Sequence, residues 1–379
     1  MIHLSDEQRM LVDSLSDLAE SEFADRAFEW QGDTPWENVE LLADRGFLGI
    51  NLDEAYGGGG LTELEAMLAV EAVGRVCPDT AQVLYEQQLV APRAVEMFGS
   101  EAVTERYLPR VTAGETFLAI AISEPGAGSD VGAMETRVTE SEDGDLVLNG
   151  GKLWVSHAEE ASAAVVWVKF SEGLGTVVVD LDAAGVEMGQ HFTNMAGHSQ
   201  SQIFFEDVPI PQENVLTRGN EAFKQQLRSL NWERLGSSAL ANGLARGALE
   251  RALEYAGDRE QFGQPIYDFQ GLQWTVVDAV KEFEASRALT YGAATSAVER
   301  GRIPDRFSTS LAKLYSAEMV EHVTSEALQV FGANGYQQGH PLEYLYRMAR
   351  ARRIAAGTDE MQKNQIADVL ERDGIPSIA

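Results

Sequence analysis

The chain has 379 residues and a formal net charge of −31, with 44% hydrophobic and 23% charged residues. This length allows two or three domains with hydrophobic cores, and the composition is typical of a soluble globular protein. The negative charge argues against nucleic acid and anionic membrane surfaces as partners, and no apolar stretch is long enough to span a bilayer.

A single cysteine, Cys77, excludes an intrachain disulfide framework and fits a reducing compartment. The N-terminal segment has no basic region followed by an apolar core, so we expect no secretory signal and a cytoplasmic location. Acidic residues are spread along the whole chain, which favours adaptation to a salt-rich cytoplasm over an acidic surface without such a role.

Residues 5 to about 120 show the apolar spacing of helices, as in Leu11, Leu15 and Leu18. The glycines at 57–60 interrupt this pattern and indicate a turn between helices. We therefore predict an N-terminal α-helical domain over residues 1–120.

After residue 129 the pattern changes to short runs rich in Val, Ile and Phe, separated by Gly, Asp and Glu. The runs at 145–148, 163–170, 175–181 and 201–205 predict an antiparallel sheet or small barrel. We assign this middle β domain to residues 121–220. The helical period then returns and predicts a C-terminal four-helix bundle over residues 221–379, with helices at 221–256, 269–301, 306–330 and 358–372.

The stretch from Ser123 to Asp130 joins the helical and β segments. It contains Pro125, Gly126 and Gly128 among hydroxyl and acidic residues, so it cannot continue a helix. Such a loop exposes backbone N–H groups and hydroxyls that suit an anionic or polar ligand. Taken alone, the stretch fits a cofactor loop and an ordinary surface turn equally well.

The order of domains and six short motifs together resemble the acyl-CoA dehydrogenase flavoprotein family over essentially the whole chain. The six motifs are residues 56–58 (YGG), 123–130 (SEPGAGSD), 149–156 (NGGKLWVS), 258–263 (DREQFG), 329–336 (QVFGANGY) and 356–358 (AGT). Each motif alone is weak, but all six in this order are specific to the family.

This resemblance implies an FAD cofactor held between the β domain and the bundle of a homotetramer. Ser123 to Ser129 would bind the flavin ring and pyrophosphate, and Trp154 and Ser156 would lie against the isoalloxazine, with the Ser156 hydroxyl near N5. Other positions would contact FAD, some of them from a neighbouring subunit. The implied FAD residues are Ser123, Gly128, Ser129, Trp154, Ser156, Arg259, Gln261, Phe262, Gln329, Ala333, Thr358 and Glu360.

The implied reaction is α,β-dehydrogenation of an acyl-CoA, with electrons passed to an electron-transfer flavoprotein. Many family members carry the catalytic glutamate where this chain has Ala356. The isovaleryl-CoA and long-chain branches place the base in a Glu-Arg pair on the first bundle helix, and Glu233-Arg234 matches that position. We therefore predict Glu233 as the base, Arg234 as a contact to CoA, and the backbone N–H of Ala356 as a donor to the thioester oxygen.

Two alternatives remain open on the sequence. The chain could catalyse a lyase-type or carrier-protein-linked reaction on the same scaffold, or it could be a non-catalytic subunit of a hetero-oligomer. No metal-ligand spacing and no dinucleotide-binding Gly-x-Gly-x-x-Gly loop occur, so we expect neither a metal nor a nicotinamide site. The sequence does not indicate which acyl group is bound.

Overall fold

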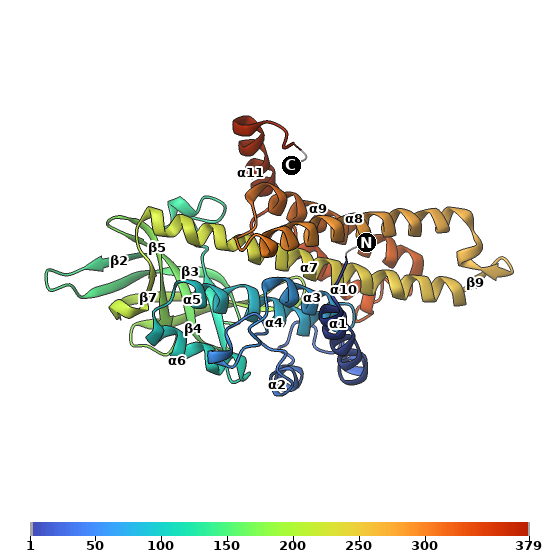
Figure 1. The fold of residues 1–379 in the computed structure, drawn as a ribbon. Coiled ribbons are helices and arrows are strands. Elements are labelled where there is room, and N and C mark those ends of the chain that lie inside the picture. The colour runs from blue at the N-terminus through green and yellow to red at the C-terminus, as the bar shows by residue number, and fades with distance from the viewer. Residues whose placement is uncertain (1–2, 378–379) are drawn as a thin grey trace. The chain divides into compact units, whose positions relative to one another are not determined.

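The computed structural model describes residues 3–377, which form two compact units (Figure 1). The sheet unit comprises residues 36–62 and 86–230. The helical unit comprises residues up to 35, 63–85 and 231 onward. The division falls inside α4 (Pro78–Leu89) and α7 (Asn220–Asp258), so each of these helices contributes turns to both units.

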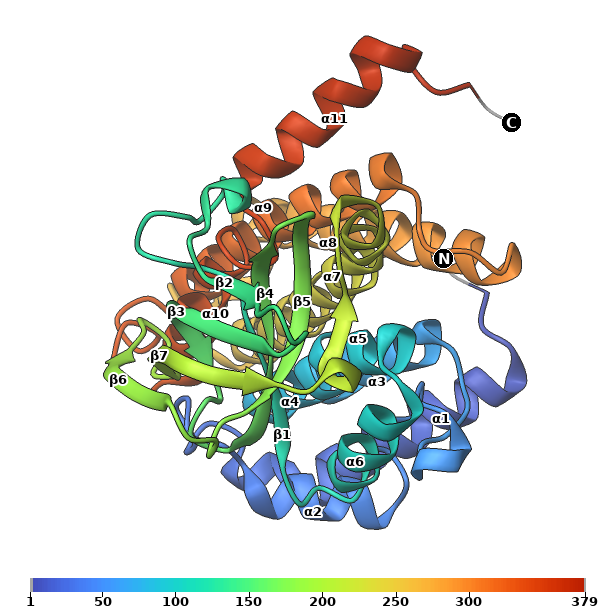
Figure 2. The same cartoon turned by 90° about the vertical axis from the view of Figure 1, so that its left-hand side faces the viewer.

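The sheet unit is built on an eight-stranded sheet (Figure 2). The strand order is β6-β7-β3-β2-β4-β5-β8, and β1 pairs with β4. Most neighbours are antiparallel, whereas β1 and β2 both run parallel to β4. The strands are β1 (Phe117–Ala121), β2 (Arg137–Glu140), β3 (Leu146–Ser156), β4 (Ala161–Phe170), β5 (Gly173–Asp180), β6 (Val186–Thr193), β7 (Ser199–Ile210) and β8 (Val215–Thr217).

Both faces of β4 are buried. Val166 and Val168 pack in a core formed with β3 and β7. Ala163 and Val165 pack on the other face, in a core that includes residues of α5 (Ala91–Phe98) and α6 (Glu101–Thr112). A strand buried on both faces has a continuous apolar sequence instead of an alternating one, as β4 does. The short helix α2 (Trp36–Asp44) also belongs to this unit.

The helical unit is dominated by long helices that run side by side (Figure 1). α8 (Gln270–Glu299) packs along α9 (Arg306–Phe331), and both α10 (Pro341–Ala351) and α11 (Asp359–Asp373) pack on α9. A two-stranded hairpin, β9 (Glu260–Gln261) and β10 (Gln264–Pro265), joins α7 to α8. The unit also contains the helices α1 (Asp6–Leu18) and α3 (Glu63–Gly74).

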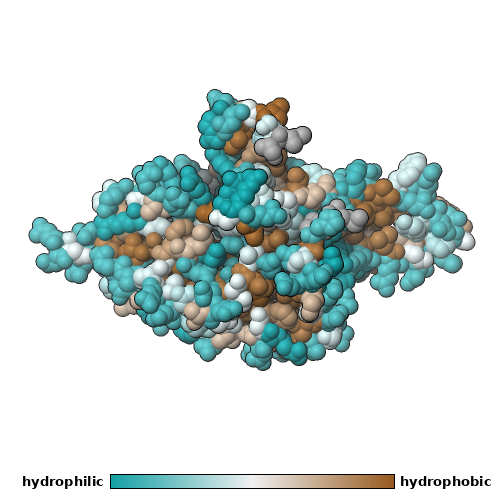
Figure 3. All heavy atoms as spheres, in the orientation of Figure 1, coloured by the Kyte–Doolittle hydropathy of each residue, from teal (hydrophilic) through white to brown (hydrophobic). Residues whose placement is uncertain are grey.

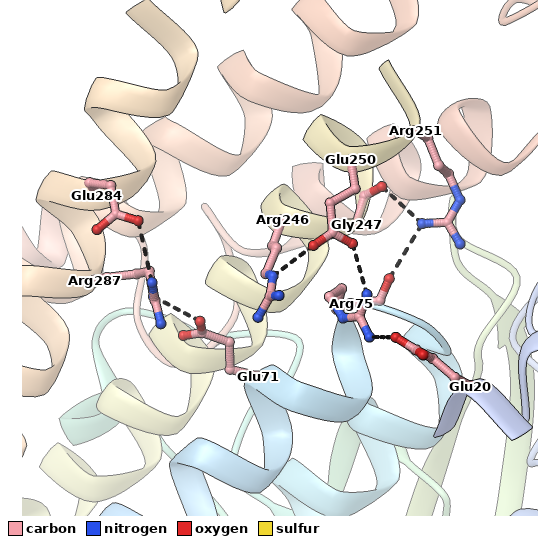
Figure 4. A network of polar contacts seen from close by, with 9 residues as sticks. All are labelled: Glu20, Glu71, Arg75, Arg246, Gly247, Glu250, Arg251, Glu284 and Arg287. Carbon is pink, nitrogen blue, oxygen red and sulfur yellow. Dashed lines mark hydrogen bonds and ion pairs between the residues drawn. The ribbon is translucent and has the colours of Figure 1, made fainter. Parts of the chain in front are cut away.

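Charged side chains link α3, α7 and α8 inside the helical unit (Figure 4). The buried carboxylate of Glu71 on α3 forms an ion pair with Arg287 on α8 at 2.9 Å and accepts a hydrogen bond from Tyr291 at 2.7 Å. Arg75, which follows α3, pairs with Glu250 on α7 at 3.0 Å. Burial raises the pKa of Glu71, although Arg287 opposes this shift. Buried charges of this kind require their partners, so the network fixes the packing of the three helices.

Hydrophobic residues are also found on the surface of the helical unit. Hydrophobic side chains gather over part of α8 in Figure 3, and the exposed residues of that helix include Trp274 and Val277. Among residues 3–377, no helix is both long and apolar enough to cross a membrane.

The predicted order of helical, β and helical domains is confirmed. The helical prediction is wrong at residues 117–120, because the apolar run there forms β1, buried beside β4. The strands β2 and β6 are not predicted, since their sequences are largely polar and exposed. The helix α10 is also missed, although the side chain of His340 caps it and Pro341 occupies its first turn.

Candidate active site

Two backbone hydrogen bonds close the loop that follows β1. The N–H of Glu124 donates to the carbonyl of Ala127 over 2.9 Å, and the N–H of Ala127 donates to the carbonyl of Glu124 over 3.1 Å. Pro125 suits the first central position of this turn because its φ is fixed. Ala127 is buried and anchors the loop. The exposed residues of the loop include Gly126, Gly128 and Ser129.

A buried ion pair holds this loop against β3. The Lys152 ammonium lies 2.7 Å from Oε1 of Glu124 and 2.9 Å from the carbonyl oxygen of Ile122. The Glu124 carboxylate also accepts from the backbone N–H groups of Glu135 at 2.6 Å and Thr136 at 3.1 Å. Burial alone would raise the pKa of Glu124, but these donors lower it. Glu124 is therefore a structural anchor of the loop.

Trp154 lies at an irregularity in β3, next to the same loop. The N–H of Leu153 donates to the carbonyl of Ser123 over 2.8 Å, which brings these two predicted cofactor segments together. Trp154 is 49% exposed, has a φ of +61°, and places its ring 4.6 Å from that of Phe192. A bulky residue in the left-handed region is strained, and such strain is concentrated at functional sites. Ser156, two residues on, is half-buried.

His157 directly follows β3 and also has a left-handed backbone, with a φ of +54°. Its Nε2 lies 2.8 Å from a carboxylate oxygen of Glu86, and its ring packs edge-on against Phe117. Burial alone would lower the pKa of His157, but the carboxylates of Glu86 and Glu160 raise it overall. His157 is not among the residues predicted from the sequence, because the position of Glu86 beside it depends on the fold.

In the helical unit, Glu233 and Arg234 lie on α7, and Arg234 contacts the predicted thioester-binding segment. Its Nε donates to the carbonyl of Ala356 over 3.4 Å, and its Nη1 donates to Asn231 over 2.9 Å and to Gln365 over 3.4 Å. Glu233, the preceding residue, is half-buried, and its Oε2 atom is buried. The guanidinium of Arg234 thus forms hydrogen bonds within the helical unit.

The segment from Ala356 to Thr358 forms a turn between α10 and α11. Ala356 has a φ of +56°, and Gly357 has a φ of +90°. Within residues 3–377 the N–H of Ala356 has no hydrogen-bond acceptor, so it remains available to a ligand. The Thr358 hydroxyl caps α11 by accepting from the N–H of Met361, and Glu360 is exposed on the first turn of that helix.

Two buried side chains hold the carbonyls of this turn. Lys313 on α9 donates from Nζ to the carbonyl of Gly357 over 2.6 Å. Gln362 on α11 donates from Nε2 to the same oxygen over 3.1 Å and to the carbonyl of Ala356 over 3.4 Å. Neither residue is predicted from the sequence, because Lys313 lies among the apolar residues of a helix and its carbonyl partner is 44 residues away.

The predicted residues Arg259, Gln261 and Phe262 lie on and beside the β9–β10 hairpin. Phe262 and Gly263 form its two-residue turn, with φ values of +53° and +83°. Phe262 is 95% exposed. Arg259 is also exposed, and in the described part of the chain its guanidinium makes no ion pair. The hairpin and the residue before it therefore present an aromatic ring and a cation to solvent.

The loop after α9 lies beside the end of α7. Asn334 donates to the Tyr255 hydroxyl over 3.0 Å, and the rings of Tyr255 and Phe331 stack at 4.1 Å. Gln329 and Ala333 are both exposed here. Ala333 is not among the residues with positive φ, so alanine is tolerated where many relatives have glycine.

The predicted residues of the helical unit thus form two groups. One group surrounds Glu233 and Ala356, and the other surrounds the hairpin beyond Asp258, the last residue of α7. At 1.5 Å per residue, α7 separates Glu233 from Asp258 by about 37 Å. One chain therefore cannot bring its own hairpin to its own Glu233.

The residues that resemblance assigns to FAD fit that cofactor in their chemistry. The exposed Trp154 indole can cover a flat ring, and hydroxyls of Ser123 and Ser156 lie on the same two segments. The Arg259 guanidinium, with no ion pair in the described chain, suits a pyrophosphate.

Comparisons with known proteins agree with this chemistry. Family models described as acyl-CoA dehydrogenase N-terminal, middle and C-terminal domains match residues 5–115, 119–208 and 220–371. The chain is 34% identical to acryloyl-CoA reductase (NADH) of Anaerotignum propionicum, over 97% of this chain and 96% of that one. It is 33% identical to 3-sulfinopropanoyl-CoA desulfinase of Advenella mimigardefordensis, over 98% and 95%.

Solved structures give the same picture. Butyryl-CoA dehydrogenase from Megasphaera elsdenii superposes with a TM-score of 0.91 at 29% identity, over 98% of this chain and 100% of that one. A chain from a structure described as the electron transferring flavoprotein of Acidaminococcus fermentans has a TM-score of 0.91 at 31% identity, with the same coverage.

Proposed function

The chain belongs to the acyl-CoA dehydrogenase family, and on that premise we propose that it oxidises an acyl-CoA thioester to the 2-enoyl-CoA, with Glu233 as the base. Members of this family are FAD-dependent oxidoreductases, and this chain is an FAD enzyme. The observation that carries the proposal is the contact between Arg234, which follows Glu233, and the carbonyl of Ala356.

Glu233 takes the α proton of the substrate in this proposal. Its carboxylate accepts the proton from Cα while a hydride leaves Cβ, and the double bond forms between these two carbons. FAD, when bound, supplies the two-electron acceptor for that hydride. Glu233 is suited to the task because it lies on a long rigid helix and is partly withdrawn from water.

The N–H of Ala356 polarises the thioester carbonyl. Negative charge develops on that oxygen as the α proton leaves, and a fixed backbone donor stabilises it. The alanine side chain does not affect this role, because the donor belongs to the main chain. Arg234 supports the turn through the carbonyl of Ala356, and its contact to CoA stays a prediction.

The sheet unit provides the flavin-binding surface in this proposal. Ser123, Gly128 and Ser129 contribute from the loop, while Trp154 and Ser156 contribute from the end of β3. The ion pair of Glu124 and Lys152 keeps the loop in place. Trp154 combines a positive φ with an exposed indole, which can cover the ring.

The cofactor site is completed by a second copy of the chain. The distance of about 37 Å along α7 keeps Arg259, Gln261 and Phe262 away from Glu233 of the same chain. A neighbouring copy can supply this hairpin, with Gln329 and Ala333 beside it. We infer a homotetramer in which each site uses residues of two chains. We also infer an electron-transfer flavoprotein as the electron acceptor, which the Acidaminococcus fermentans structure supports. Thr358 and Glu360 belong to the same proposal as cofactor contacts.

A second candidate function rests on Ala356 itself. This chain lacks the carboxylate that many relatives have there, and its relatives include an enzyme named as a desulfinase. Such a chain would catalyse a reaction of an acyl thioester without net oxidation. That reaction would need the same flavin site and the Ala356 N–H, but no carboxylate base for α,β-dehydrogenation.

Anaerobic titration of the purified FAD protein with a panel of short, branched, cyclic and long acyl-CoAs tests the proposal. Loss of the oxidised flavin absorbance with at least one member is expected. Tight FAD without bleaching by any acyl-CoA would favour the second candidate. A chain that purifies colourless without a partner protein would instead indicate a non-catalytic subunit.

A further inference from the structure

The carbonyl oxygens of Ala356 and Gly357 are held from within the helical unit by three side chains. Arg234 and Gln362 donate to the carbonyl of Ala356, each over 3.4 Å. Lys313 and Gln362 donate to the carbonyl of Gly357, over 2.6 Å and 3.1 Å. We propose that Lys313 is a positioning residue that, with Gln362 and Arg234, fixes the turn so that the Ala356 N–H faces the substrate thioester. This inference rests on the proposed function.

The orientation follows from the planarity of the peptide bond. In each trans peptide the N–H points opposite to the C=O. Donors that hold the carbonyls of Ala356 and Gly357 inward therefore turn the N–H groups of Gly357 and Thr358 outward. These contacts hold the peptide plane that joins Ala356 to Gly357, directly after Ala356, whose φ is +56°. The Ala356 N–H lies in the preceding peptide plane with the carbonyl of Ala355, so its direction depends on the backbone that these three side chains hold in place.

The setting of Lys313 favours a positioning role over a contribution to fold stability. The side chain is 1% exposed, and within the described chain no carboxylate lies at ion-pair distance from it. The nearby charged groups are Asp359 on α11, Arg234 on α7, and Arg352 and Arg353 after α10. Burial lowers the pKa of Lys313 to about 8, Asp359 opposes this, and the arginines add to it. A buried ammonium without a close counterion is costly.

Lys152 in the sheet unit is a second buried lysine, and it has the carboxylate partner that Lys313 lacks among residues 3–377. It is fully buried, but its ammonium lies 2.7 Å from the Glu124 carboxylate. Lys313 has a backbone carbonyl in the corresponding place. Replacing Lys313 with an apolar side chain of similar length should therefore preserve the fold and loosen only the turn.

The experiment compares Lys313→Met with the wild type as FAD-loaded protein, using three measurements. We expect an unchanged or higher Tm, hydrogen exchange in peptides covering 353–362 faster by about tenfold, and kcat lower by about tenfold with KM within about threefold. Lys281→Met is the matched control, because Lys281 is an exposed lysine on α8. It should change none of the three measurements. Gln362→Met should reproduce the exchange and kcat effects.

Two results would overturn the inference. One is unchanged hydrogen exchange over 353–362 in Lys313→Met, which would mean that Lys313 does not hold the turn in place. The other is a large fall in Tm with faster exchange throughout the helical unit, which would mean that Lys313 supports the fold. If the wild type oxidises no acyl-CoA, the proposed function fails, while the exchange and Tm measurements still decide the role of Lys313.

Discussion

Replacing Glu124 with glutamine should destabilise the sheet unit far more than the loss of one hydrogen bond would. The carboxylate accepts from the Lys152 ammonium and from the backbone N–H groups of Glu135 and Thr136. A glutamine has one oxygen, so its NH2 group must face one of these donors. The Lys152 charge also remains buried without a counterion, and breaking such a pair costs about 3–5 kcal/mol.

Replacing the partner, Lys152, should destabilise the sheet unit less than replacing Glu124. In Lys152→Met the buried charge is removed, and Glu124 keeps its two backbone donors. The double variant Glu124→Gln/Lys152→Met should therefore be more stable than Glu124→Gln alone, with a coupling of about 0.5–3 kcal/mol between the two sites. A double-mutant cycle in urea measures this coupling directly.

Thermal unfolding gives a second measure of the same effect. About 3–5 kcal/mol corresponds to a fall in Tm of roughly 10 °C for a unit of this size. Weaker retention of FAD should accompany it, because Glu124 anchors the loop that carries Ser123 and Ser129. Glu135→Gln is the control, since that side chain is exposed in the same segment and should change stability by less than about 0.5 kcal/mol. Equal stabilities of Glu124→Gln and Glu135→Gln would refute the reasoning.

Three further predictions concern pH, the hairpin and salt. The pKa of His157 is raised in the folded protein by the Glu86 carboxylate. The stabilising contribution of protonated His157 is therefore complete below its pKa in the unfolded chain, about 6.5, and is lost as pH rises through its pKa in the folded protein. The Tm difference between wild type and His157→Asn should therefore shrink between about pH 6 and pH 9, and a constant difference would contradict this. Phe262→Asn should relieve the strained hairpin turn but weaken FAD retention and tetramer formation in gel filtration; an unchanged tetramer with full FAD would argue against the shared site. With a net charge of −31, the protein should have a higher Tm in about 2 M KCl than in dilute buffer, and equal Tm values would exclude adaptation to salt.

The sequence predicts the parts of the fold that have a local pattern. The long helices α7, α8 and α9 repeat apolar residues at helical spacing, and β4 is a continuous apolar run because both its faces are buried. β1 is assigned wrongly because its parallel partner lies about 45 residues further along the chain, beyond any local pattern. α10 does carry local signals of a helix, with a proline in its first turn and apolar residues at 342, 345 and 348.

The candidate site divides in the same way. Trp154 and Phe262 belong to motifs that can be recognised in the sequence, but their left-handed backbone and exposure are visible only in the structure. Glu124, His157 and Lys313 act through partners 28, 71 and 44 residues away, and neither propensity nor spacing identifies such pairs. Short motifs therefore identify part of the candidate site, and the residues that act through long-range polar contacts are found only in the structure.

The central claim is that Glu233 removes the α proton, and anaerobic reduction of the bound flavin by an acyl-CoA tests it most directly. Glu233→Gln should keep its FAD but reduce the flavin more slowly than wild type by about 10²–10⁴-fold. Glu254→Gln, an exposed carboxylate on the same helix, should react like wild type. A Glu233→Gln protein that keeps more than about a tenth of the wild-type rate would contradict the account, because general-base catalysis contributes far more than that.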